Sequence, residues 1–80
     1  MKRYRIILNT IDLVKEFVNM VNQYGVQADV HSGSYSVDAQ SILGIFTLNL
    51  TKELQLAVNS IYPEEDIEDF EKDLDKFIVK

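Results

Sequence analysis

The clearest pattern along the chain is a run of apolar residues at helical spacing between residues 11 and 24. These residues recur at intervals of three and four, so they form a stripe along one side of a helix. They are Leu13, Val14, Phe17, Val18, Met20, Val21 and Tyr24. Asn9 and Thr10 offer oxygens that cap a helix, and Gly25 suits a left-handed terminating residue. The pattern therefore predicts one amphipathic helix over residues 11–24.

Four shorter segments show the alternation, or the β-branched and aromatic composition, that is typical of strands. They are residues 4–8, 26–31, 35–38 and 52–58. The residues that alternate onto one face are Val26, Ala28 and Val30 in the second segment and Leu54, Leu56 and Val58 in the fourth. The turn at residues 32–34, Ser-Gly-Ser, predicts that the second and third strands form a hairpin.

Two further helices are predicted mainly from the residues at their starts. Ser41 precedes the apolar residues 42–46 and suits the cap of a short helix, with residues 47–50 as its frayed end. Pro63 suits the first position of a last helix. The buried stripe of that helix is expected to consist of Ile67, Phe70, Leu74, Phe77 and Ile78.

The predicted order of elements is β-α-β-β-α-β-α. Strands with one apolar and one polar face favour a mostly antiparallel sheet with its helices stacked on one side. The expected fold class is therefore α+β, an open-faced β-sandwich with four strands and three helices on one face. The 80 residues, 46% of them hydrophobic, suffice for a single core, so one domain over residues 1–80 is expected.

The net charge of −5 is concentrated near the carboxyl end of the sequence. Residues 64–75 contain eight acidic residues and one basic residue, Lys72. We interpret this block as an exposed helix face, with an acidic docking surface for a basic partner as the alternative. The negative balance disfavours nucleic-acid binding, because phosphate backbones require clustered cations. No apolar run approaches about 18 residues, so we expect no membrane span, no secretory signal and a cytoplasmic protein.

The inventory of chemically reactive side chains is small. The chain has no cysteine, which excludes disulfides, thiolate metal sites and thiol nucleophiles. His31 is the single histidine; it alternates to the polar face of a strand two residues after Asp29, and we interpret the two as a solvated pair. No spacing indicates a zinc site, a calcium loop or a phosphate-binding glycine loop. The sequence therefore predicts no enzyme, no metal and no cofactor.

Residues 36–50, with the sequence SVDAQSILGIFTLNL, resemble the regulatory-serine region of HPr, the phosphocarrier protein of the bacterial sugar phosphotransferase system. In that family a strand runs into Lys/Gln-Ser-Ile-Met/Leu-Gly and then into a short helix with exposed apolar residues. The family has the order β-α-β-β-α-β-α and an open-faced β-sandwich fold. By element order the resemblance covers nearly the whole chain, and by specific residues it covers this segment.

The histidine on which HPr accepts phosphate has no counterpart here. HPr carries it in a Gly-Ile/Leu-His-Ala-Arg-Pro motif between the first strand and the first helix, where this chain has Leu-Asn-Thr-Ile-Asp-Leu at residues 8–13. Thr10 cannot form the labile phosphoimidazole, and Asp12, at the position of the arginine, would repel a phosphoryl donor. The resemblance thus implies a degenerate active-site loop at Asn9, Thr10 and Asp12. Histidine-dependent phosphotransfer is lost unless His31 replaces it, and the placement of His31 argues against that.

Ser41 does match the regulatory serine of the family. In some bacteria a dedicated kinase phosphorylates that serine, and the phosphorylated protein binds a transcriptional regulator. A phosphate on Ser41 would lie against free backbone amides and the helix dipole, whereas the alternative is a plain N-cap serine. The resemblance also implies that Ile42, Leu43 and Phe46 form a partner-docking surface. Residues 45 and 48, Ile and Leu, would face the sheet.

The leading hypothesis is an HPr-like protein that has lost the phosphorylatable histidine. It would act as a regulatory or protein-binding module through the helix at Ser41, with phosphotransferase-system or regulatory proteins as partners by resemblance. One alternative is a phosphocarrier for sugar transport with unconventional chemistry. Another is a structural adaptor that keeps only the fold and binds through its acidic last helix.

Overall fold

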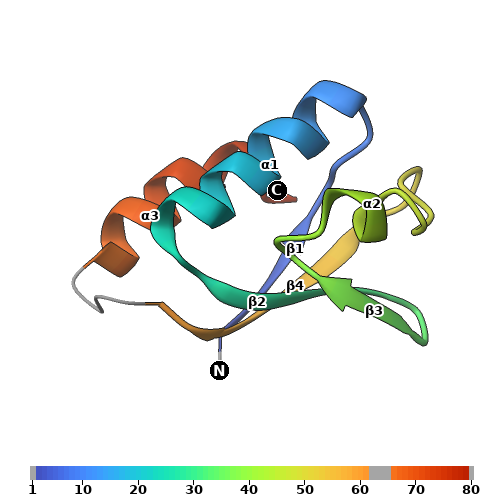
Figure 1. The fold of residues 1–80 in the computed structure, drawn as a ribbon. Coiled ribbons are helices and arrows are strands. Elements are labelled where there is room, and N and C mark those ends of the chain that lie inside the picture. Colours follow the sequence, from blue (N-terminus) through green and yellow to red (C-terminus); the bar gives the residue numbers. More distant parts are fainter. Residues whose placement is uncertain (1, 62–65, 80) are drawn as a thin grey trace.

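A computed structural model of the chain describes residues 2–61 and 66–79. Within these residues four strands form one sheet in the order β1-β4-β2-β3, and every neighbouring pair is antiparallel. The strands are β1 (Lys2–Ile6), β2 (Gln27–Ser32), β3 (Tyr35–Asp38) and β4 (Leu54–Ser60). The helices are α1 (Ile11–Tyr24), α2 (Ile42–Ile45) and α3 (Ile67–Leu74), and α3 continues into the 3-10 turn η2 (Asp75–Phe77). All three helices cover the same face of the sheet (Figure 1), so the predicted α+β open-faced sandwich is confirmed.

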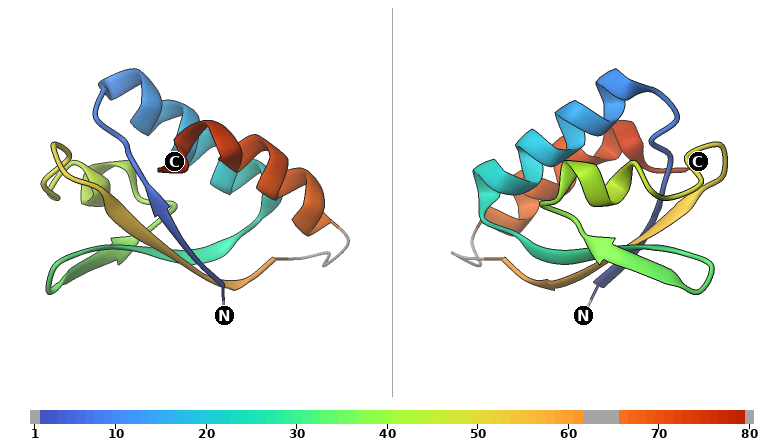
Figure 2. Two further views of the ribbon diagram at one scale, coloured as in Figure 1. Left: turned by 180° about the vertical axis from the view of Figure 1, so that it is seen from behind. Right: turned by 45° about the vertical axis from the view of Figure 1, so that its right-hand side comes forward.

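The helices form two groups above the sheet. The helices α1 and α3 lie side by side along it, as both views in Figure 2 show. The short helix α2 lies on the same face, toward the edge strand β3, and it contacts both α1 and β3. The open side of the sheet carries no helix in any of the views.

The helix α1 begins and ends where the sequence predicts. Thr10 is its N-cap, and the Thr10 hydroxyl oxygen accepts a hydrogen bond from the Leu13 N–H. Gly25 terminates it with φ of 62°, a left-handed conformation that costs glycine little because glycine has no Cβ. Five residues of α1 are buried: Val14, Phe17, Val18, Met20 and Val21.

The core lies between the helices and the inner face of the sheet. The alternating residues predicted to share one face of β2 and β4 are all buried: Val26, Ala28, Val30, Leu54, Leu56 and Val58. Edge-to-face ring pairs hold α1 against the carboxyl-terminal segment, with centroids 5.6 Å apart for Phe17 and Phe77 and 5.7 Å apart for Tyr24 and Phe70. Such pairs add about 0.5–1.5 kcal/mol beyond the apolar area that they bury.

The predicted bounds of three strands were wrong by one or two residues. β1 covers residues 2–6 instead of 4–8, β2 covers 27–32 instead of 26–31, and β4 covers 54–60 instead of 52–58. The pairing of β1 with β4 ends at Ile6, but Leu8 in the following loop is also buried. The apolar run therefore extends beyond the strand, and the composition alone places the strand too late in the sequence.

The carboxyl-terminal end departs further from the prediction. The helix α3 ends at Leu74, and Phe77 belongs to η2. Ile78 then forms an antiparallel bridge with Ile6, and the Val79 N–H donates to the Arg5 carbonyl at 2.9 Å. Phe77 is buried and Ile78 is partly buried, so they cover the core through a turn and a bridge, not through a longer helix.

The predicted start of the last helix at Pro63 lies outside the described residues, as do Glu64 and Glu65. In the part of the acidic block that the structure describes, four carboxylates are exposed and two are partly exposed. The exposed ones are Glu68, Asp69, Asp73 and Asp75, and the partly exposed ones are Asp66 and Glu71. The interpretation of this block as an exposed helix face is therefore confirmed for residues 66–75.

Candidate functional site

The loop between β1 and α1 is where the sequence predicts a degenerate active site. Asn9, Thr10 and Asp12 are all exposed there, with Asp12 in the first turn of α1. The Thr10 hydroxyl oxygen lies 3.1 Å from the Leu13 nitrogen, and the Thr10 carbonyl accepts from the Val14 N–H at 3.1 Å. The threonine therefore acts as the N-cap of α1.

His31 lies on the opposite side of the sheet from this loop. It belongs to β2, where its register neighbours are Ser36 on β3 and Gln55 on β4. The residues on either side of it along the strand, Val30 and Ser32, point the other way, and Val30 enters the core beneath the helices. The imidazole consequently shares the helix-free face with Asp29 and cannot reach the start of α1.

Ser41 is the N-cap of α2, as predicted. Its hydroxyl oxygen accepts from the Gly44 N–H at 3.1 Å, its own N–H donates to the Asp38 carbonyl at 3.0 Å, and its side chain is exposed. A Cβ at position 44 would lie only 3.1 Å from the Ser41 hydroxyl oxygen and 3.2 Å from the Val37 Cβ. Glycine therefore lets the first turn of α2 pack closely against both the cap and β3.

The apolar residues of α2 divide between the core and the solvent. Ile45 is fully buried and Leu48 is 8% exposed, which confirms that these two face the sheet. Leu43 is 78% exposed and Phe46 is 40% exposed. Ile42 is partly buried and packs against the core, so the expected three-residue surface reduces mainly to Leu43 and Phe46.

Sequence reasoning missed two exposed apolar residues beside the first loop. Ile11 is 62% exposed at the first position of α1, and Ile7 is 36% exposed just after β1. A signal for Ile11 was present, because this residue falls outside the apolar stripe that begins at Leu13. Ile7 and Ile11 therefore expose apolar surface at the loop that joins β1 to α1.

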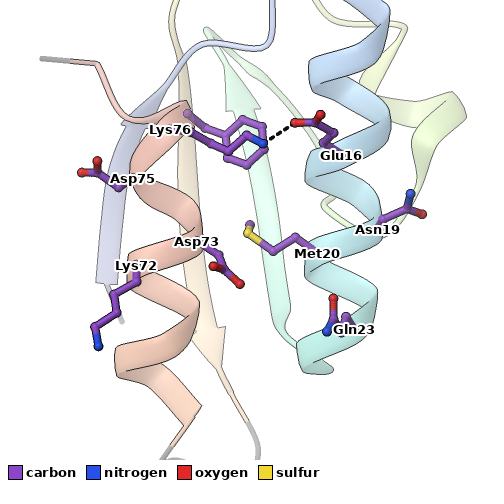
Figure 3. A pocket seen from close by; sticks show the side chains of 9 residues that line it. Glu16, Asn19, Met20, Gln23, Lys72, Asp73, Asp75 and Lys76 are labelled. Carbon is purple, nitrogen blue, oxygen red and sulfur yellow. Dashed lines mark ion pairs between the residues drawn. The ribbon is translucent and has the colours of Figure 1, made fainter.

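A groove of about 420 Å³ separates α1 from α3. The buried residues Met20 and Phe77 are among those that line it, and an ion pair between Lys76 of η2 and Glu16 of α1 crosses it (Figure 3). Both members of this pair are about half exposed, so its contribution to stability is at most about 1 kcal/mol. We interpret the ion pair across the groove as a structural contact between α1 and the carboxyl-terminal segment.

Two tyrosines tie α3 to the rest of the molecule and have perturbed acidity. The Tyr24 hydroxyl donates to the Asp73 carboxylate at 2.6 Å, and this hydrogen bond, with burial and nearby carboxylates, raises the pKa of Tyr24 to about 12. Burial raises the pKa of Tyr4, and the neighbouring Glu71 carboxylate adds to the effect. Both shifts keep the neutral phenol in the folded protein.

Among residues 2–61 and 66–79, no three histidine, cysteine, aspartate or glutamate side chains come together as a candidate metal site. In the same part of the chain, none of the helices has the length and apolar content needed to cross a bilayer.

Comparison with known proteins finds no matching family model and no matching curated sequence. Among solved structures, the chain is similar to HPr-C-His from Thermoanaerobacter tengcongensis, with 24% identity, a TM-score of 0.74, and coverage of 98% of this chain and 91% of that chain. It is also similar to the phosphocarrier protein HPr from Bacillus anthracis str. Ames, with 20% identity, a TM-score of 0.63, and coverage of 90% and 92%. The chain therefore has the HPr-like fold over almost its whole length, as the resemblance of residues 36–50 predicts.

Proposed function

We propose that this chain is an HPr-like protein-binding module without enzymatic activity, which contacts its partners through α2. Leu43 and Phe46 supply the apolar contacts, and phosphorylation of Ser41 regulates the interaction. The observation that carries this proposal is the exposure of 78% of Leu43, within a helix of only four residues, and of 40% of Phe46, its C-cap. The two residues are three apart and therefore neighbours on one side of the helix, and a contiguous exposed apolar patch is typical of an interaction surface.

The surface is held in place before any partner arrives. Ile45 anchors α2 in the core, and the Ser41 cap fixes its first turn. A preformed surface loses little conformational freedom on binding, so more of its apolar burial contributes to affinity.

Ser41 is exposed and lies directly before the apolar pair, which makes it suited to regulation. A phosphate there would add about −1.5 to −2 charge beside Leu43. The Asp38 carboxylate accepts from the Gln40 N–H at 2.8 Å and adds negative charge nearby. A partner that binds the phosphorylated form would therefore supply arginine or lysine next to an apolar pocket.

The same module is proposed to lack phosphocarrier activity. Thr10 is engaged as a cap at the position where HPr carries its histidine, and Asp12 replaces a cation. We expect no acid-labile label from phosphoenolpyruvate and the first enzyme of the phosphotransferase system. An acid-labile label on the wild-type chain that disappears in the variant His31→Ala would contradict this part of the proposal.

The regulatory part is tested with the serine kinase that phosphorylates HPr. Incubation of the chain with this kinase and ATP should add the mass of one phosphate to the wild type and none to the variant Ser41→Ala. A wild type without mass gain, or a Ser41→Ala variant that still gains mass, would remove Ser41 as the regulatory site.

Docking is tested with the phosphorylated chain and a transcriptional regulator that binds phosphorylated HPr. The double variant Leu43→Ala, Phe46→Ala should bind at least about tenfold more weakly, since truncation of the few residues that dominate an interface costs about 2 kcal/mol or more. The matched control is Ile11→Ala, which removes an exposed apolar side chain from α1 and should bind within about twofold of wild type. An equal loss in both variants would argue against α2 as the contact surface.

A further inference from the structure

The face of the sheet opposite the helices carries two complete rows of side chains. Each strand contributes alternate residues to this face, because those between them enter the core. The first row consists of Arg3, Ala57, Asp29 and Asp38, and the second of Arg5, Gln55, His31 and Ser36. The helices leave this face uncovered (Figure 2).

Charge is segregated across these rows. Both arginines lie on β1 at one side, and both aspartates lie on β2 and β3 at the other, while β4 between them contributes uncharged residues. Asp29 lies directly opposite Asp38 in the β2–β3 pairing. Like charges at opposed positions destabilise a strand pair, so the aspartate side of this face carries a local repulsion, and the arginines of the same rows lie at the other side.

The arginines keep donors available for a further partner. Arg3 uses one nitrogen to donate to the Gln55 side-chain oxygen at 3.0 Å, and Arg5 makes a loose ion pair with Glu53 at 3.8 Å. A guanidinium has five N–H donors, so these contacts do not exhaust either group. At the centre of the face Ala57 is small and 3% exposed, so it does not hold an approaching surface away.

A second copy of the chain has the complementary pattern if it is turned about a two-fold axis parallel to the strands. This rotation places β1 over β3 of the other copy and β4 over β2, and it preserves position along the strands. Arg3 then faces Asp38 of the second copy, and the same contact forms again on the other side. A two-fold axis perpendicular to the strands would instead place arginines over arginines.

We propose that this helix-free face is an isologous interface with a second copy of the chain, related by the two-fold axis parallel to the strands. Arg3 pairs directly with Asp38 of the second copy, while Arg5 lies opposite Ser36, diagonal to Asp38, and Asp29 lies opposite Ala57, next to Arg3. Stacked sheets lie about 10 Å apart, a gap that an arginine and an aspartate side chain span together. The interface leaves α2 exposed on the far side of each copy. It therefore stands or fails independently of the proposed docking surface.

Sedimentation equilibrium on the full chain, from low micromolar to about millimolar concentration, tests the association. We expect a monomer–dimer equilibrium that weakens at least about tenfold between low salt and 0.5 M NaCl, since exposed charge pairs are screened at high ionic strength. A monomer at every concentration would overturn the proposal, and so would a dimer that is insensitive to salt.

Charge reversal identifies the face. The variant Arg3→Glu, Arg5→Glu should be monomeric, as should Asp29→Arg, because each makes the rows nearly uniform in charge. An equimolar mixture of the two variants should recover a dimer at low salt, since a negative face then meets a positive one. Circular dichroism verifies that each variant is folded; if one is not, salt dependence and the other variant still decide the outcome.

The matched control is Lys15→Glu, Lys52→Glu, which changes net charge by the same amount at exposed positions outside the face. It should dimerise within about threefold of wild type. Loss of the dimer in this control, or failure of the mixed variants to associate, would overturn the assignment. Loss of the dimer in Leu43→Ala, Phe46→Ala would place the interface on α2 and overturn it as well.

Discussion

The helices α1 and α2 begin in the same way but are held to the molecule very differently. In each, a hydroxyl oxygen accepts a backbone N–H three residues later at 3.1 Å, from Thr10 to Leu13 and from Ser41 to Gly44. However, α1 has 14 residues, five of them buried, whereas α2 has four residues and a single buried one, Ile45. The same kind of cap therefore begins a well-buried helix at α1 and a short, largely exposed helix at α2.

The surroundings of the two helices increase this contrast. α1 is braced by the carboxyl-terminal segment through two ring pairs, the Tyr24–Asp73 hydrogen bond and the Glu16–Lys76 ion pair. α2 exposes Leu43 and Phe46 and packs against β3 through a glycine. Local opening requires less free energy where fewer buried contacts are broken. We therefore expect α2 to be the first helix to open.

The largest expected effect comes from the anchor of α2. Ile45→Ala should lower the free energy of unfolding by about 2–5 kcal/mol, because it removes buried methyl groups and leaves a cavity. Leu43→Ala, two residues earlier and exposed, should change it by less than about 0.5 kcal/mol. Urea denaturation measures both. Equal losses would contradict the division of α2 into a buried and an exposed side.

The two caps provide a more direct test of the comparison. Thr10→Ala and Ser41→Ala should each cost about 1 kcal/mol in global unfolding. Amide exchange should differ, because loss of the Ser41 cap opens a helix with one anchor, whereas α1 stays packed against α3. We expect faster exchange at the Ile45 and Phe46 amides in Ser41→Ala and little change at the Val14 amide in Thr10→Ala. The exposed turn variant Ser34→Ala is the control, and similar exchange changes in both cap variants would contradict the comparison.

The start of α1 carries a charge that the start of α2 lacks. Asp12→Asn should lower the free energy of unfolding by about 0.3–1 kcal/mol at low salt, because a carboxylate in the first turn interacts favourably with the helix dipole. The loss should shrink in 1 M NaCl, and Asp12→Glu should retain most of the stability. A loss that does not depend on salt would assign Asp12 a packing role instead.

The sequence predicts the parts of the fold that depend on local rules. The bounds of α1, its Gly25 terminus and the Ser41 cap follow from side chains within one or two turns, and all are confirmed. The bridge between Ile6 and Ile78 could not be predicted, because it joins the two ends of the chain. The position of Phe77 fits the helical spacing of the last apolar stripe, but the structure buries this residue from the 3-10 turn η2. Periodicity alone therefore predicts a last helix that extends too far.

The site follows the same division. The spacing around Ser41 predicts the cap and the inward direction of Ile45, since both depend on helical geometry. Burial of Ile42 depends on how α2 lies against the core, which no local pattern specifies. The charge rows on the helix-free face require the strand order and register, and both are set by packing of segments distant in sequence.

The smallest expected effect concerns the brace between α1 and α3 at high pH. The pKa of Tyr24 is raised to about 12 by its hydrogen bond to Asp73, whereas an unfolded tyrosine titrates near 10. Between these two pKa values the folded state retains a proton that the unfolded state releases. The contribution of this tyrosine to the free energy of unfolding is therefore fully present below about pH 10 and is lost between about pH 10 and 12. Tyr24→Phe should make this decline shallower without abolishing it, because the pKa of Tyr4 is also raised. Urea denaturation across this pH range, together with tyrosinate absorbance, measures the effect; an unchanged decline in Tyr24→Phe would show that the brace does not couple this proton to folding.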